Sequence, residues 1–242
     1  MNVGRVASIR RYPLLGCGGE ELSEAQVLDV GVEGDRIYAL REKSSNSILE
    51  PVGKSYDWGK TITEPKLLLL NASLREGRLE VELPAGITLS EDEIDEGLSE
   101  FLSREVEVLE APWVMRSRSL RGRAIHLLTT SSIDALRSRK NDLDFSIARF
   151  RPNLYLVVGE GAPDFCEDLW VGKELLIGKD LVLKVEARNP RCAVTTLPQR
   201  FVSREPEVLS SIVEINHGHL GVVCSVVREG RVSVGDYVEL RG

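Results

Sequence analysis

The chain has 242 residues, of which 42% are hydrophobic and 29% charged, and its formal net charge is −7. This composition is that of a soluble globular protein with one large or two small domains, and it excludes intrinsic disorder. The acidic balance argues against nucleic-acid binding, because nucleic-acid-binding domains carry a basic surface. No apolar run approaches the roughly 20 residues of a membrane-spanning helix, so no membrane association is expected.

The amino-terminal residues Met1–Val6 have the pattern of a strand and lack the long apolar core of a signal peptide. We therefore expect a cytoplasmic protein. The cysteines Cys17, Cys166, Cys192 and Cys224 form no CxxC pair, so the strongest sequence signature of a zinc site is absent. In a reducing compartment they are expected to be free thiols.

The first 110 residues are expected to form mainly short strands. Turn residues at 31–36 predict a hairpin between strands 25–30 and 37–42, and Arg75-Glu76-Gly77 predicts another between 66–72 and 78–83. Further strands are expected at 3–12, 88–89 and 106–109.

One helix is expected to interrupt these strands. Ser90 is a candidate N-cap, and Glu93 three residues later completes a capping box. The apolar face of this helix would carry Ile94, Leu98, Phe101 and Leu102. The acidic residues of its first turn are interpreted as a solvated helix start, which the helix dipole favours.

The second half of the chain begins with an Arg- and Ser-rich connection, 111–123. Many short strands with glycine turns and few helices indicate a mainly β fold, a β-barrel with a few short helices. Strands are expected at 124–130, 154–158, 174–177, 181–187, 220–227 and 232–240, and short helices at 131–139 and 206–213.

Charge is uneven, because residues 1–110 carry a net charge of −10 and the remaining residues +3. Basic residues therefore gather in the half that could hold a small anionic ligand. Arg149 and Arg151 precede Pro152, which disfavours a helical Arg151. In an extended segment both arginines would point to one side and could grip a phosphate. The alternative is a surface ion pair with Asp142 or Asp144.

A second candidate anion site is Thr129-Thr130-Ser131-Ser132, between an expected strand and an expected helix. Hydroxyl groups and free backbone N–H groups at a helix N-terminus bind anions. Simple N-capping is the alternative for this segment.

Cys192 follows Arg188 and Arg191 directly after an expected strand. Nearby guanidinium groups favour the thiolate, the form that binds metals or carries sulfur. The alternative is a buried cysteine that acts as a small apolar residue, which suits the other three thiols. His217 and His219 could bind zinc from one face of a strand, but the neighbouring Asn216 and Gly218 favour a loop.

These segments together resemble the MOSC family, the carboxy-terminal domain of molybdenum cofactor sulfurase, and within it the amidoxime-reducing proteins that reduce N-hydroxylated compounds. The resemblance covers nearly the whole chain and implies an amino-terminal MOSC β-barrel region, 1–110, and a MOSC domain, 111–242. The segments that carry it are 9–13, 34–36, 126–132, 149–153, 167–170, 177–178, 191–192 and 235–238.

The resemblance implies that Cys192 is the protein ligand to molybdenum, or the persulfide carrier in sulfurases, and hence the catalytic residue. It implies a molybdenum cofactor, a molybdopterin, and no pyridoxal phosphate site in this chain. The pterin and its phosphate would be held by Arg36, Thr129, Ser131, Ser132, Arg149, Arg151, Asn153 and Arg191. The chain departs from the family at Leu15 and Gly16, where animal amidoxime reductases carry Lys-Ser.

Two functions follow from this resemblance. The first is an enzyme, a molybdenum-dependent oxidoreductase that reduces a small N-hydroxylated substrate with electrons from a ferredoxin or flavoprotein. The alternative is a sulfur carrier, in which Cys192 receives a persulfide from a cysteine desulfurase for metal–sulfur cofactor assembly. A cofactor-free barrel used only for interactions is the third possibility.

Overall fold

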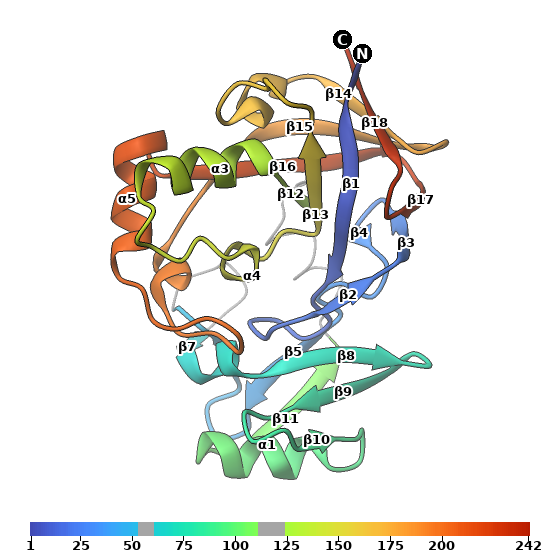
Figure 1. Ribbon diagram of the computed structural model, residues 1–242. Coiled ribbons are helices and arrows are strands. Elements are labelled where there is room, and N and C mark those ends of the chain that lie inside the picture. The colour runs from blue at the N-terminus through green and yellow to red at the C-terminus, as the bar shows by residue number, and fades with distance from the viewer. Residues whose placement is uncertain (53–60, 111–123) are drawn as a thin grey trace.

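The computed structural model describes residues 1–52, 61–110 and 124–242 (Figure 1). The expected connection at 111–123 lies outside the described residues. Among the helices of the described segments, none is both long and apolar enough to cross a membrane.

The fold is built on a closed barrel of seven strands (Figure 1). Strand β1 closes it by pairing antiparallel with both β13 and β18. Nearly all neighbours are antiparallel; the exception is the parallel pair β12–β13. Around the ring the strands are β13 (Leu154–Val158), β12 (Ile125–Thr129), β16 (His219–Arg228), β15 (Leu181–Pro190), β14 (Glu174–Ile177), β18 (Tyr237–Arg241) and β1 (Asn2–Arg11).

Smaller sheets adjoin the barrel. A short strand, β2 (Glu20–Leu22), pairs with the end of β1. One sheet has the order β10 (Thr88–Leu89), β9 (Arg78–Glu82), β8 (Asn71–Arg75). A second has the order β11 (Val106–Glu110), β5 (Tyr38–Glu42), β6 (Ser47–Glu50), β7 (Thr61–Thr63). A third has the order β17 (Gly230–Ser233), β3 (Glu24–Leu28), β4 (Gly31–Val32).

Helices are short and lie at the edges of these sheets (Figure 1). In the described residues they are α1 (Ile94–Leu102), α3 (Thr130–Arg139), α4 (Ile147–Phe150) and α5 (Glu207–Asn216). Three 3₁₀ turns are η1 (Pro65–Leu69), η2 (Cys166–Trp170) and η3 (Ala193–Thr196).

The apolar residues divide into separate cores. One fills the barrel, with Ile125, Leu154 and Leu183 fully buried. A second lies between α1 and its sheets, where Ile94, Leu98 and Leu102 are buried. Buried and exposed side chains alternate along the short strands, and the fold is mainly β, as the sequence predicts.

Several predicted elements are confirmed, including the hairpin at 75–77 and the strands at 154–158 and 174–177. The hairpin between 25–30 and 37–42 is wrong. Strand β3 pairs with β4 and β17, whereas β5 pairs with β6 and β11. Local turn residues permit a reversal there, but the pairing partners come from distant parts of the chain.

Two further boundaries differ. The start of the predicted strand 66–72 is the 3₁₀ turn η1, which begins with Pro65. The predicted strand 232–240 is two strands, β17 and β18, that belong to different sheets. Gly235, with a φ of 94°, lies in the turn between them.

Candidate functional site

Arg149 and Arg151 do not form the expected extended pair. They belong to the helical turn α4, and Arg151 ends it in the left-handed region with φ 55° and ψ 50°. Pro152 disfavours the right-handed helical conformation for the residue before it, and the left-handed one satisfies this restriction while reversing the chain. The two guanidinium groups therefore have separate environments.

Arg149 is fully buried and bonded within the chain. Its Nη2 pairs with Asp144 Oδ2 at 2.9 Å, and its Nη1 donates to the carbonyl groups of Thr195 and Ser203 at 3.2 and 3.1 Å. The ion pair with Asp144 is the alternative that the sequence offered, and it joins a buried Arg149 to an Asp144 side chain that is 44% exposed. Arg149 holds the segment that follows Cys192, and these contacts occupy its guanidinium.

Arg151 lies over the ring of Tyr12, with 4.5 Å between its guanidinium carbon and the ring centroid. Burial lowers the pKa of Arg151, and the charge of Arg36 lowers it further. No carboxylate in the described residues forms an ion pair with it, whereas Arg36 is bonded to Asp35 at 2.5 Å. The positive charge of Arg151 is thus available to a ligand.

Arg191 lies beside this charge. Burial, together with the charge of Arg151, lowers its pKa to about 10, although the nearby Cys192 thiol acts to raise it. Its Nη2 donates to the Phe150 carbonyl at 2.9 Å, and its buried Nε has no partner among the described residues. Arg191 therefore has an unused donor and lies near the Cys192 thiol, and the charge of Arg151 lies close to Arg191.

His126 is a neighbour of these cations that the sequence did not single out as a site residue. Burial, together with the charges of Arg191 and Arg36, lowers its pKa to about 3. Its Nδ1 lies 3.3 Å from the carbonyl of Arg151, and its Nε2 has no partner in the described part of the chain. A neutral imidazole beside guanidinium groups is thus available for a hydrogen bond.

Cys192 begins the 3₁₀ turn η3 and is half-buried, while the other three cysteines are buried. Its carbonyl accepts the N–H and the hydroxyl of Thr195 at 3.1 and 2.9 Å. The N–H of Arg191 donates to the Gly218 carbonyl at 2.8 Å. Backbone bonds on both sides therefore fix this thiol next to the cationic residues.

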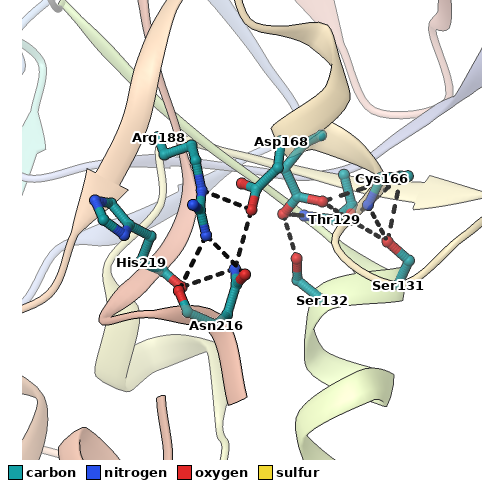
Figure 2. Close-up of polar contacts among 9 residues, drawn as sticks. Thr129, Ser131, Ser132, Cys166, Asp168, Arg188, Asn216 and His219 are labelled. Carbon is teal, nitrogen blue, oxygen red and sulfur yellow. Dashed lines mark hydrogen bonds and ion pairs between the residues drawn. The ribbon is translucent and has the colours of Figure 1, made fainter. Parts of the chain in front are cut away.

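The Thr129–Ser132 segment does bind an anion, but that anion is Glu167 of the same chain (Figure 2). Thr129 Oγ1 and Ser132 Oγ each donate to the carboxylate at 2.6 Å. Ser131 Oγ lies 2.9 Å from Thr129 Oγ1 and donates to Cys166 Sγ at 3.2 Å. Glu167 is fully buried, and burial raises its pKa.

Asn153 is likewise bonded within the chain. Its Oδ1 accepts the backbone N–H of His126 at 3.1 Å, and its Nδ2 donates to the Arg10 carbonyl at 3.2 Å. It joins β1 to β12 beside Arg151.

Of the predicted cofactor residues, Arg151, Arg191 and in part Arg36 keep free donor capacity, whereas the side chains of Thr129, Ser131, Ser132, Arg149 and Asn153 are engaged internally.

The zinc hypothesis gains no support. His217 is the exposed C-cap of α5, with φ 54°. Among residues 1–52, 61–110 and 124–242, no group of three or more His, Cys, Asp or Glu side chains could hold a metal.

An anionic cofactor with a soft metal fits the remaining donors. Arg151 and Arg191 supply positive charge, the buried Arg191 Nε and His126 Nε2 lack partners, and Cys192 supplies a thiol. Guanidinium groups match phosphate by forked hydrogen bonds, and thiolates are ligands for soft metals. The fold and these residues together define a barrel protein with a cationic, thiol-bearing site.

The chain belongs to the MOSC family. The MOSC domain matches residues 115–239, and the MOSC N-terminal beta barrel domain matches residues 3–111. No curated protein matches the chain.

The chain is similar to solved structures of low sequence identity. The YuaD protein from Bacillus subtilis is 12% identical, with a TM-score of 0.54 over 99% of this chain and 96% of that chain. YiiM from Geobacillus stearothermophilus is 17% identical over 50% of this chain and 55% of that chain, with a TM-score of 0.39. At such identities the likeness to YuaD concerns the fold alone.

Proposed function

We propose that this MOSC protein binds a molybdenum cofactor and is an oxidoreductase that reduces small N-hydroxylated compounds. The observation that carries the proposal is the Arg151 guanidinium, which forms no ion pair with a carboxylate in the described residues and lies close enough to Arg191 for their charges to interact. Arg191 in turn interacts with the thiol of Cys192. An uncompensated buried cation is costly, so its retention is explained if an anionic ligand neutralises it.

Each residue has a stated role in this proposal. Arg151 and Arg191 bind the anionic pterin group, with a weaker contribution from Arg36, and the Cys192 thiolate is the ligand to the metal. The bound cofactor supplies two-electron chemistry at molybdenum. Electrons come from a separate ferredoxin or flavoprotein in a shared cytoplasmic compartment.

Metal and pterin analysis tests this function. The protein is produced in a host that synthesises the cofactor, and molybdenum and pterin are measured per chain. Cys192→Ala should lose most of the metal, whereas Cys224→Ala should keep it, because Cys224 is buried in the barrel core. Equal molybdenum in Cys192→Ala and the unaltered protein would show that Cys192 is not the ligand.

A sulfur-carrier function is the second candidate, and the greater exposure of Cys192 relative to the other thiols favours it. The Cys192 thiolate would attack the outer sulfur of a cysteine desulfurase persulfide, form an S–S bond and release the desulfurase thiolate. Intact mass after incubation with desulfurase and cysteine should show one added sulfur on Cys192. An unchanged mass argues for the reductase alone.

A further inference from the structure

Asp168, which follows Glu167 in the chain, is the centre of a second polar network with Arg188 and Asn216 (Figure 2). Its Oδ2 pairs with Arg188 Nε at 2.8 Å and accepts Asn216 Nδ2 at 3.0 Å. The side chains of Asp168 and Arg188 are 14% and 31% exposed, so this charge pair is partly shielded from water. The contacts join three separate segments: η2, β15 and the end of α5.

Arg188 and Asn216 complete the network. Arg188 Nη2 donates to both oxygens of Asn216, at 2.7 Å to Oδ1 and 3.0 Å to the carbonyl. Asn216 Nδ2 also donates to the His219 carbonyl at 3.1 Å. These bonds span the turn 216–219, in which His217 and Gly218 both have positive φ. A turn with two left-handed residues is thereby held in one conformation.

The same turn holds the backbone on which Cys192 lies. The Gly218 carbonyl accepts the N–H of Arg191 at 2.8 Å, and Pro190 pairs with His219 across β15 and β16. Direct contacts therefore lead from Asp168 through Arg188 and Asn216 to the residue before Cys192. Among residues 1–52, 61–110 and 124–242, no hydrogen bond holds the Cys192 sulfur itself, so its position depends on this backbone.

The other end of the network is anchored by the residue next to Asp168. Glu167 binds Thr129 and Ser132 at the start of α3, and it is fully buried. Two successive carboxylates thus attach η2 to two different parts of the fold. The bonds of Glu167 therefore also fix the backbone of Asp168, whose carboxylate contacts Arg188.

We propose that Asp168 is a positioning residue for Cys192, acting through Arg188 and the 216–219 turn. The proposal deepens the proposed function, because it assumes that the Cys192 thiol is the reactive group. The network keeps the thiol beside Arg191, and without it the Cys192 backbone samples other conformations that expose the sulfur.

The test is the rate of Cys192 alkylation by iodoacetamide, measured by peptide mass on the unloaded full chain across a range of pH. Loss of the shielded bonds in Asp168→Ala should raise the rate about fivefold at each pH. Asp164→Ala is the matched control, because it removes a carboxylate of the same loop that pairs with Arg139 at an exposed site. Because the alkylation assay needs no metal or pterin, its result does not depend on the outcome of the cofactor measurements.

A double-variant comparison tests whether Asp168 acts on Cys192 through Arg188. Arg188→Met should raise the rate by a similar factor, and the Asp168→Ala/Arg188→Met double variant should not exceed either single one. Hydrogen exchange should quicken at 191–196 and 216–219 but not in the barrel strand β13. If Asp168→Ala is poorly folded, Asp168→Asn, which keeps an acceptor oxygen, should give an intermediate rate. An unchanged or lower alkylation rate, or an equal rise in Asp164→Ala, would overturn the proposal.

Discussion

Arg151 stacks on Tyr12 while the Tyr12 hydroxyl donates to the Pro152 carbonyl at 3.1 Å, so one aromatic side chain contacts both the guanidinium and the backbone next to it. The cation–π contact stabilises a charge that burial disfavours. Arg151 is thus held in a fixed direction without a carboxylate that would neutralise it.

Replacing Arg151 should therefore separate binding from folding. We expect Arg151→Met to leave the melting temperature of the unloaded protein unchanged or slightly higher, because a desolvated charge is removed. Pterin content in a cofactor-producing host should fall by about tenfold or more. Arg10→Met is the control, since Arg10 pairs with Glu21 instead. Normal pterin content in Arg151→Met would contradict the assignment of this residue.

Arg149 should behave in the opposite way. Arg149→Met removes a fully buried guanidinium and leaves three carbonyl groups and Asp144 without their donor. Urea denaturation of the unloaded protein should show a loss of about 3 kcal/mol. Arg139→Met, which breaks an exposed pair with Asp164, should cost about 1 kcal/mol or less. Similar losses in both variants would show that burial does not strengthen the Arg149 contacts.

Glu167 should impose a pH dependence on stability. Because burial raises its pKa above 4.5, the folded state binds the proton more tightly than the unfolded state. Its contribution to stability is therefore present at low pH and is lost as the pH rises from about 4.5 through the folded pKa. Glu167→Gln should remove this fall, as measured by urea denaturation at several pH values. The exposed Glu160→Gln should keep the pH profile of the unaltered protein, and an identical profile in Glu167→Gln would refute the linkage.

Gly16 should resist replacement by the family's serine. Its φ is 85°, and an added Cβ would lie 2.9 Å from Pro51 Cδ. Gly16→Ser should therefore lower the free energy of unfolding by about 2 kcal/mol. Gly77→Ser is the matched control, because Gly77 has φ 82° but nothing within 4 Å of the added Cβ. Equal losses in the two variants would mean that Pro51 yields without cost.

Most strands could be predicted because alternation of apolar and polar residues directly reflects a half-buried strand. Strand β3, with Ala25 and Val27 buried between exposed neighbours, is an example. Its partners could not be predicted, since β17 lies some two hundred residues later and no local signal specifies that pairing. The false hairpin at 31–36 has this origin.

Site prediction had a similar limit. The residue types at Thr129–Ser132 predicted an anion site, with N-capping as the alternative. Sequence does not reveal that these hydroxyl groups bind the Glu167 carboxyl group of the same chain. Glu167 lies 35 residues from Ser132 and was noted only as part of a family segment. His126 was missed as a site residue because its cationic neighbours come from other parts of the chain.

Closure of the barrel by β1 has a consequence for engineering. Residues 3–11 lie in the amino-terminal family match, yet they belong to β1, which pairs with β13 and β18 from the other match. A fragment that starts near residue 115 would expose the hydrogen-bonding edges of both strands, and such edges recruit other chains. Exchanging the amino-terminal half between two relatives therefore also exchanges one strand of the barrel. A chimeric protein must carry a β1 whose side chains fit the core of the protein that receives it.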